Sequence, residues 1–179
     1  MKEVYIFLVT GFEEIEAVGT IDILRRGSVN VKSVSLEDSK QVNSSRDVPV
    51  IADLMFNEVN FANAEMLILP GGTVRINEHE GLKKEILAFA QAGKNVAAIC
   101  AAPMVLGGLG LLKGKNATAY PGFEQYLEGA NFIKTAVVVD GNIITGRGPG
   151  LTMDFALKLV EILKGKAKSD EVAEGLLLK

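Results

Sequence analysis

The stretch of sequence that decides the fold is residues 95–103, which read Asn95-Val96-Ala97-Ala98-Ile99-Cys100-Ala101-Ala102-Pro103. Residues 96–99 are apolar without alternation, which is typical of a strand buried on both faces of a parallel sheet. Pro103 suits the first turn of a helix. Cys100 is therefore predicted at the turn from a buried strand into a helix, which is the position of a nucleophile elbow.

The position of Cys100 allows two interpretations. The backbone amides at the start of the helix would be free to face a thiolate or an oxyanion. The helix end would lower the thiol pKa only slightly, because its effect is about 0.3–1 kcal/mol. Alternatively, Cys100 is a small buried hydrophobic side chain, as most free cysteines are. Position alone favours neither interpretation.

Outward from this stretch, short apolar runs alternate with longer amphipathic segments along the chain. The apolar runs lie at residues 5–9, 29–36, 66–69 and 96–99, and the amphipathic segments at residues 13–26, 82–92 and 151–163. This alternation predicts a doubly wound α/β domain, in which helices cover both faces of a mostly parallel sheet. Asp140-Gly141 separates two further β-type runs and predicts a hairpin. We expect one domain over residues 1–179.

Composition and charge exclude several classes of protein. The 179 residues are 48% hydrophobic, and 19 Lys and Arg against 22 Asp and Glu give a net charge of -3. This balance predicts a small molecule or another protein as partner, with no nucleic acid and no membrane. One cysteine and one histidine exclude an internal disulfide and the usual zinc sites, so no metal is expected. The N-terminal apolar run is too short for a signal peptide, and we expect a cytoplasmic protein.

Glu16 differs from its acidic neighbours in its place on the predicted helix. At about 100° per residue with Phe12 at zero, Glu16 falls at about 40°, inside the apolar stripe, whereas Glu13 and Glu14 fall at about 100° and 200°. A buried carboxyl without a partner is costly or takes up a proton. The start of this helix lies at the same sheet edge as Cys100. The alternative is a glutamate at the border of the stripe that reaches solvent.

Two glycine-rich segments follow predicted strands, namely Leu69-Pro70-Gly71-Gly72 and Gly146-Arg147-Gly148-Pro149-Gly150. Both fit ordinary turns. Both also lie at the carboxyl ends of strands, where backbone amides can face a ligand.

Six segments, in this order along the chain, resemble motifs of the ThiJ/PfpI family. They are residues 11–16, 22–26, 45–48, 69–72, 98–103 and 146–150. The similarity is closest to the branch of the family that contains the parkinsonism-associated deglycase. It implies a flavodoxin-like three-layer sandwich, a homodimer and no cofactor.

The resemblance also implies roles for individual residues. Cys100 matches the oxidation-sensitive cysteine of the elbow, and Glu16 matches the glutamate hydrogen-bonded to it. The oxyanion-hole amides match Gly72 and Ala101. The residues matched to the substrate pocket are Gly71, Arg26, Arg46, Tyr120, Gly148 and Pro149. Of these, the two arginines match basic residues near the dimer interface and the cysteine, although both also fit ordinary surface ion pairs.

Two departures from the family pattern narrow the predicted chemistry. Ala101 stands where the peptidase-like branch has a histidine, and Tyr120 stands where the deglycase branch often has one. Without an imidazole to activate the thiol, peptidase or amidohydrolase chemistry is disfavoured, and Glu16 is the expected acid-base group. We expect Cys100 and Glu16 to share one proton at neutral pH.

The predicted function is a cofactor-independent glyoxalase or deglycase. It would convert small 2-oxoaldehydes, such as methylglyoxal to lactate, or act on a glycated substrate, in stress protection. The alternative is an oxidative-stress sensor or chaperone that works through oxidation of Cys100.

Overall fold

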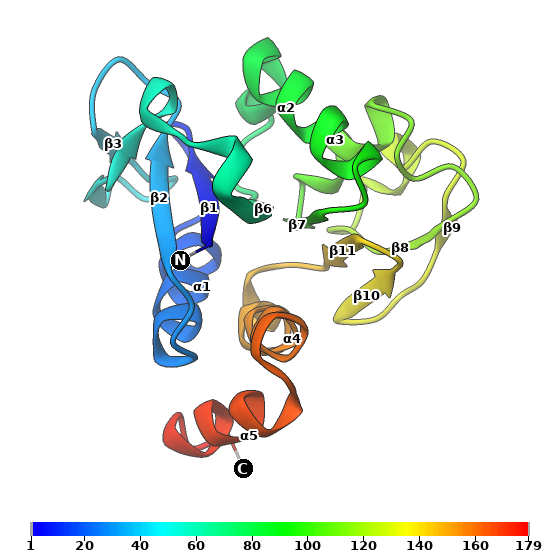
Figure 1. Cartoon of the computed structure of the whole chain (residues 1–179). Coiled ribbons are helices and arrows are strands. Elements are labelled where there is room, and N and C mark those ends of the chain that lie inside the picture. Colours follow the sequence, from blue (N-terminus) through cyan, green and yellow to red (C-terminus); the bar gives the residue numbers. More distant parts are fainter. Residues whose placement is uncertain (1, 179) are drawn as a thin grey trace.

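A seven-stranded sheet forms the centre of the molecule, for which a computed structural model describes residues 2–178. The strands are β1 (Glu3–Leu8), β2 (Val31–Ser35), β5 (Leu54–Met55), β6 (Ala64–Leu69), β7 (Asn95–Ile99), β10 (Val137–Asp140) and β11 (Ile143–Gly146). They are arranged in the order β10-β11-β7-β6-β1-β2-β5, and β10 alone runs antiparallel to its neighbour. The mostly parallel sheet predicted from the apolar runs is confirmed (Figure 1).

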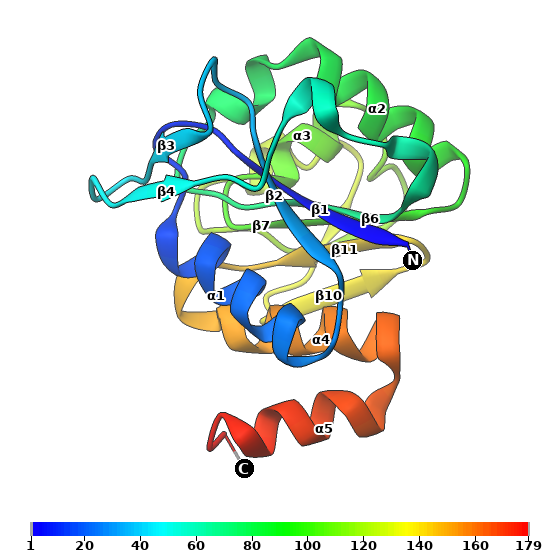
Figure 2. The same ribbon diagram turned by 60° about the vertical axis from the view of Figure 1, so that its left-hand side comes forward.

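Helices cover both faces of this sheet, as Figure 2 shows. One face carries α1 (Glu14–Arg26) and α4 (Thr152–Lys164), and α5 (Lys166–Gly175) packs outside α4. The other face carries α2 (Glu80–Gln91) and α3 (Pro103–Gly108). Each face buries its own hydrophobic cluster, because strands such as β1 direct successive side chains to opposite sides. The three-layer, flavodoxin-like sandwich is therefore confirmed.

Smaller elements lie outside this frame, and the apolar runs alone did not predict most of them. Two short pairs form separate sheets: β3 (Gln41–Asn43) with β4 (Pro49–Ile51), and β8 (Asn116–Ala117) with β9 (Asn131–Phe132). Within residues 2–178, 3-10 turns lie at Phe56–Glu58, Phe61–Asn63, Arg75–Glu78, Glu124–Tyr126 and Pro149–Leu151. The hairpin predicted at Asp140-Gly141 is present, and Gly141 supplies the left-handed backbone that its turn requires, with a φ of 62°.

The topology gathers three chain segments at one edge of the sheet. The strands β6, β1 and β7 are parallel, and β6 lies between the other two, so the loops that follow them leave the same edge. In a doubly wound sheet, this edge is where ligands bind.

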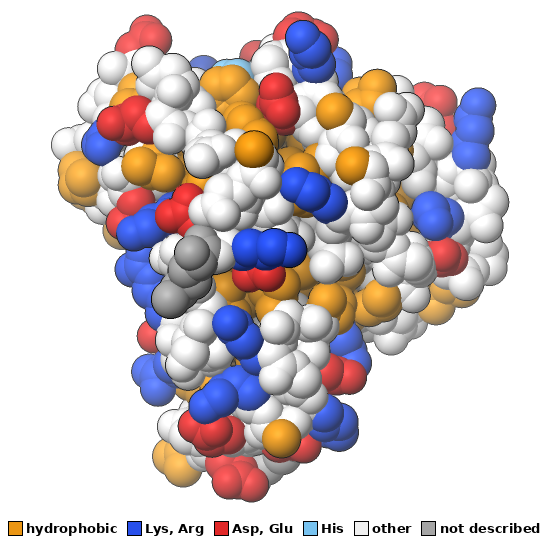
Figure 3. All heavy atoms as spheres, viewed as in Figure 1, with side chains coloured by type: hydrophobic (Ala, Val, Ile, Leu, Met, Phe, Trp, Pro, Cys, Tyr) orange, Lys and Arg blue, Asp and Glu red, His pale blue; other side chains and the backbone are white. Residues whose placement is uncertain are grey.

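The surface carries both signs of charge. Figure 3 shows Lys and Arg side chains interspersed with Asp and Glu over the visible face. Every helix within residues 2–178 is too short or too polar to cross a lipid bilayer.

Candidate active site

Cys100 follows β7 directly and occupies a strained backbone conformation. Its φ of 67° lies in the left-handed region, which non-glycine residues adopt at a cost of about 1–3 kcal/mol and which is common at active sites. Two hydrogen bonds hold this turn: the Cys100 amide donates to the Gly146 carbonyl (3.0 Å), and the Cys100 carbonyl accepts from the Tyr120 amide (2.9 Å). The structure thus places Cys100 on the strand-to-helix elbow, with 7% of its surface exposed.

Glu16 lies in the first turn of α1 and is fully buried, with 0% of its surface exposed. The carboxylate of Glu13 caps the helix by accepting a hydrogen bond from the Glu16 amide (2.7 Å). The Glu16 side chain then points inward, where its Oε2 accepts a hydrogen bond from the Gly71 amide (2.8 Å) and its carboxyl pairs with the Cys100 thiol. The prediction from helix phase is confirmed, and the solvent-reaching alternative is wrong.

The loop after β6 closes over this pair, and it needs glycine at two positions. A Cβ on Gly71 would lie 2.6 Å from the Cβ of Cys100 and 2.9 Å from Glu16 Oε2, so a side chain would displace the pair. Gly72 has a φ of 96°, and a Cβ there would lie 2.3 Å from the Glu13 amide nitrogen. The loop is fixed to the start of α1 because the Glu13 amide donates to the Gly71 carbonyl (2.8 Å).

Burial controls the protonation of the pair. Removal from water raises the pKa of Glu16 to about 7, although the hydrogen bonds from Gly71 and Cys100 oppose this increase. Burial and, after it, the neighbouring Glu16 carboxylate together raise the pKa of the Cys100 thiol to about 12. Between these pH values the pair holds one proton, with the charge on Glu16 and the proton on sulfur. The slight decrease expected from the helix end is outweighed by burial.

The amides of Ala101 and Gly72 both donate hydrogen bonds toward the Cys100 sulfur, and both act to lower the thiol pKa. These are the two residues matched to the oxyanion hole from the sequence. Two converging amides can stabilise negative charge on sulfur or on an oxygen bonded to a carbon that the sulfur attacks.

Two buried oxygen atoms on α1 have no hydrogen-bond partner among the described residues: Glu16 Oε1 and Thr20 Oγ1. Glu16 therefore uses one carboxyl oxygen to hold its place and leaves the other without a protein partner. An oxygen in this state can accept a proton from a bound molecule.

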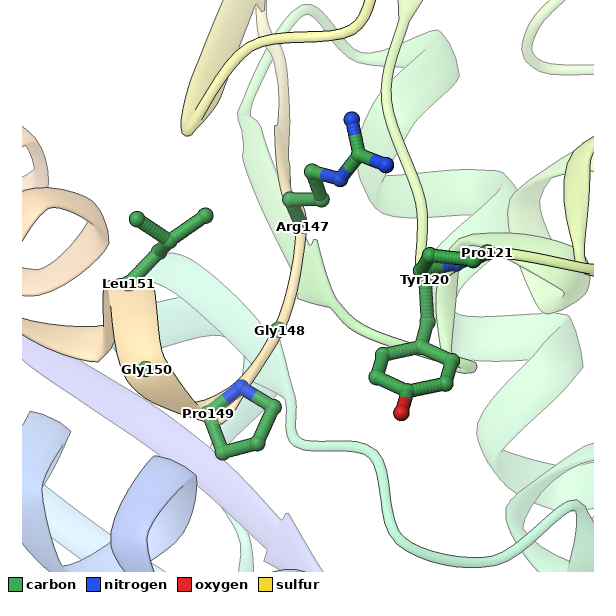
Figure 4. Close-up of a pocket in the computed structure, with 7 residues that line it drawn as sticks. All are labelled: Tyr120, Pro121, Arg147, Gly148, Pro149, Gly150 and Leu151. Atoms are coloured by element: carbon green, nitrogen blue, oxygen red, sulfur yellow. The ribbon is translucent and has the colours of Figure 1, made fainter.

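A cavity of about 320 Å³ lies beside the elbow and is lined by Tyr120, Pro121, Arg147, Gly148, Pro149, Gly150 and Leu151. Figure 4 shows Tyr120 and Pro121 on one side, with the segment from Arg147 to Leu151 on the other. Three residues matched to the substrate pocket therefore lie together here: Tyr120, Gly148 and Pro149. Arg147 also lines the cavity and was not among the predicted site residues.

The structure does not bring the two predicted arginines to Cys100 within one chain. Arg26 ends α1 and pairs with Asp22 (2.8 Å), and ten residues of helix, about 15 Å, separate it from Glu16. Arg46 lies in the β3–β4 turn, where its guanidinium donates to the Ser45 carbonyl (3.2 Å) and its charge acts on Glu14. Within one chain both arginines contact other groups, and their predicted place near the dimer interface and the cysteine stays a prediction.

The single histidine is also engaged elsewhere. His79 Nδ1 accepts a hydrogen bond from the Leu82 amide (2.9 Å) and so caps α2, while its ring lies edge-on against Phe56 at 4.5 Å. Among residues 2–178, no three His, Cys, Asp or Glu side chains lie together as a group that could hold a metal ion. The carboxyl that pairs with the Cys100 thiol is that of Glu16.

These features define a class of protein: a flavodoxin-like sandwich with a cysteine on a strained elbow, paired to a buried glutamate on the first helix. The chain belongs to the DJ-1/PfpI family, whose model matches residues 2–162. The family resemblance noted in the sequence is therefore confirmed.

Known members of the family match nearly the whole chain. Protein dj-1beta of Drosophila melanogaster is 38% identical over 182 residues, covering 99% of this chain and 97% of that protein. The glutathione-independent glyoxalase DJR-1.2 of Caenorhabditis elegans is 28% identical over 169 residues, covering 93% of this chain and 90% of that protein. Against two Arabidopsis thaliana relatives, the DJ-1 homologs A and B, the chain spans only 47% and 41% of their lengths.

Solved structures agree with the family assignment. The oxidized DJ-1 of Toxoplasma gondii superposes with a TM-score of 0.94 at 36% identity, covering 99% of this chain and 98% of that chain. A cysteine-to-alanine mutant of a DJ-1 superfamily protein from Salmonella typhimurium gives a TM-score of 0.93 at 35% identity, with the same coverage.

Proposed function

We propose that this protein is a cofactor-independent glyoxalase that converts small 2-oxoaldehydes to 2-hydroxy acids, such as methylglyoxal to lactate. One observation carries the proposal: the Cys100 thiol is hydrogen-bonded to a buried carboxyl and faces two backbone amides. A relative that is named a glutathione-independent glyoxalase supports it.

The first step is the attack of sulfur on the aldehyde. Above pH 7 the Glu16 carboxylate accepts the thiol proton while Cys100 Sγ bonds to the aldehyde carbon. The aldehyde oxygen becomes an oxyanion, and the amides of Gly72 and Ala101 stabilise it. Glu16 then returns the proton to this oxygen, which gives a neutral hemithioacetal.

The second step moves a proton between two carbons. The free Oε1 of Glu16 removes the hydrogen from the carbon bonded to sulfur and delivers a proton to the neighbouring carbon. In the same step the hydroxyl proton of the first carbon moves to the oxygen of the neighbouring carbon, which becomes the alcohol carbon. The result is a thioester of the 2-hydroxy acid on Cys100. Water hydrolyses it, so methylglyoxal and one water give lactic acid and the thiol is restored.

A homodimer is the second part of the proposal. Exposed apolar side chains gather on the outer side of α1 and the adjoining β3–β4 turn: Ile15 is 53% exposed, Val18 45% and Val48 48%. A patch of this kind on a soluble protein favours a protein contact. In the proposed dimer this surface forms the contact, and Arg26 and Arg46 of one chain lie near Cys100 of the other. Light scattering of the wild type and Val18→Glu tests this arrangement, since a monomer in both would refute it.

An oxidation sensor remains the second candidate, because a similar solved structure is described as an oxidized DJ-1. Oxidation of cysteine requires thiolate character and exposure. Cys100 is 7% exposed, and burial raises its pKa to about 12. These properties favour a thiol that is activated by its base during catalysis over a thiol that is oxidised freely.

Lactate formation tests the proposal. The reduced protein is incubated with methylglyoxal without glutathione, and lactate is counted per protein chain, because any thiol binds aldehydes reversibly. We expect repeated turnover in the wild type and none in Cys100→Ser or Glu16→Gln. If the wild type forms no more lactate than Cys100→Ser, the proposed glyoxalase activity is refuted and the role as an oxidation sensor is favoured.

A further inference from the structure

Arg147 differs from the other arginines of the chain because its guanidinium has no partner among residues 2–178. Arg25, Arg26 and Arg75 each pair with a carboxylate, at 2.9 Å, 2.8 Å and 3.4 Å. Arg46 donates to a backbone carbonyl. Within residues 2–178, the guanidinium of Arg147 forms no ion pair and no hydrogen bond, although the residue is half-buried.

The surroundings of Arg147 suit a negatively charged group. It lines the cavity of about 320 Å³ beside the elbow, and the other lining residues are aromatic, proline, glycine or leucine, with no carboxylate among them. A guanidinium stays protonated at all working pH values and offers a planar set of donors that fits a carboxylate or a phosphate. Apolar walls strengthen its attraction for an anion.

The cavity is joined to the reacting sulfur by the backbone. One wall is held by the Tyr120 amide, which donates to the Cys100 carbonyl, and the other begins next to Gly146, whose carbonyl accepts from the Cys100 amide. Both walls therefore depend on the main chain of Cys100. The cavity therefore adjoins the elbow that carries the sulfur, although Cys100 itself does not line it.

We propose that Arg147 determines substrate specificity by binding an anionic group, a carboxylate or a phosphate, at the end of the substrate remote from its reactive carbonyl. This inference rests on the proposed function for the reactive carbonyl. The substrate class is thereby narrowed to 2-oxoaldehydes, or their adducts, that carry a negative charge.

The test uses two alkylating reagents of similar size and different charge, iodoacetate and iodoacetamide. Cys100 is the only cysteine of the chain, so the rate of labelling reports this site alone. We expect Arg147→Gln to lower the ratio of the iodoacetate rate to the iodoacetamide rate about tenfold, while the iodoacetamide rate stays unchanged. The matched control is Arg25→Gln, which removes the same charge from the far end of α1 and should leave the ratio as in the wild type.

Other outcomes overturn the inference. An unchanged ratio in Arg147→Gln would show that Arg147 does not attract anions to the sulfur. An equal decrease for both reagents would show that the variant has altered the thiol or the fold. Arg147→Lys, which keeps the charge, should recover most of the iodoacetate rate.

Competition identifies the anionic group. Inorganic phosphate and acetate are compared as inhibitors of the iodoacetate reaction of the wild type at equal ionic strength. Stronger inhibition by phosphate assigns a phosphate group and stronger inhibition by acetate assigns a carboxylate, whereas inhibition by neither contradicts the site. Alkylation requires no turnover, so these results stand apart from the lactate assay. If alkylation of Cys100 depends on the charge of the reagent but no lactate is formed, the glyoxalase proposal is refuted and the anion site at Arg147 is supported.

Discussion

Replacing Glu16 with Gln should shift the pH dependence of Cys100 reactivity to lower pH. The Glu16 carboxylate and the thiol are hydrogen-bonded, and the negative charge on Glu16 is one of the causes that raise the thiol pKa to about 12. Two unit charges about 4 Å apart interact with about 4 kcal/mol at an effective dielectric constant of about 20. At 1.36 kcal/mol for a tenfold change, this corresponds to about 3 pH units at most.

Iodoacetamide labelling between pH 6 and 11 measures this shift. In Glu16→Gln the thiolate should form at a pH up to about 3 units lower than in the wild type, so labelling near pH 9 should be faster in the variant. Turnover should nevertheless be lost, because the amide cannot accept the thiol proton. The matched control is Glu13→Gln, which keeps the Glu16 carboxylate. An unchanged profile, or one shifted to higher pH, would refute the coupling between the two groups.

Three further predictions concern stability. The fold raises the pKa of Glu16 from 4.5 to about 7, so the folded protein binds more protons than the unfolded chain in this window. Its free energy of unfolding should therefore fall by about 3 kcal/mol at most as pH rises from 4.5 to 7, and urea unfolding should show no such fall in Glu16→Gln. Gly72→Ala should lower the free energy of unfolding by at least about 2 kcal/mol. Gly93 has a similar left-handed backbone in open space, so Gly93→Ala should lower it by about 1 kcal/mol. Equal losses in the two variants would contradict the role of the Glu13 contact. Thr20→Val removes a buried hydroxyl that has no partner among the described residues. The variant should be more stable by about 1 kcal/mol, as measured by thermal unfolding. A loss of stability would show that the hydroxyl forms a hydrogen bond.

The sequence predicted those parts of the structure that depend on local periodicity. Continuous apolar runs identified the buried parallel strands, and the helix phase of Glu16 correctly separated it from Glu13 and Glu14. Both predictions succeed because burial on a regular element repeats with a fixed period. The elbow was found in the same way, since Cys100 stands between an apolar strand and a proline that begins a helix.

Other parts depend on contacts between distant segments and carry no local signal. The β3–β4 pair is only three residues long on each strand, too short for a pattern of alternation. Arg147 appeared as part of a glycine-rich turn, and only the structure shows that its guanidinium has no counter-ion among residues 2–178. The raised pKa of the Cys100 thiol could not be predicted from the sequence. Burial raises this pKa and the helix end lowers it, and only the structure shows that burial has the larger effect.

In the proposed reaction Glu16 carries a proton between two carbons of an aldehyde bonded to Cys100. Lactate formed from methylglyoxal in D₂O tests it most directly, because a proton that passes through a carboxyl group can exchange with solvent. We expect more than one lactate per chain, with deuterium at the alcohol carbon, and none from Glu16→Gln. Lactate formed by Glu16→Gln at the wild-type rate, or wild-type lactate no higher than that of Cys100→Ser, would contradict the claim.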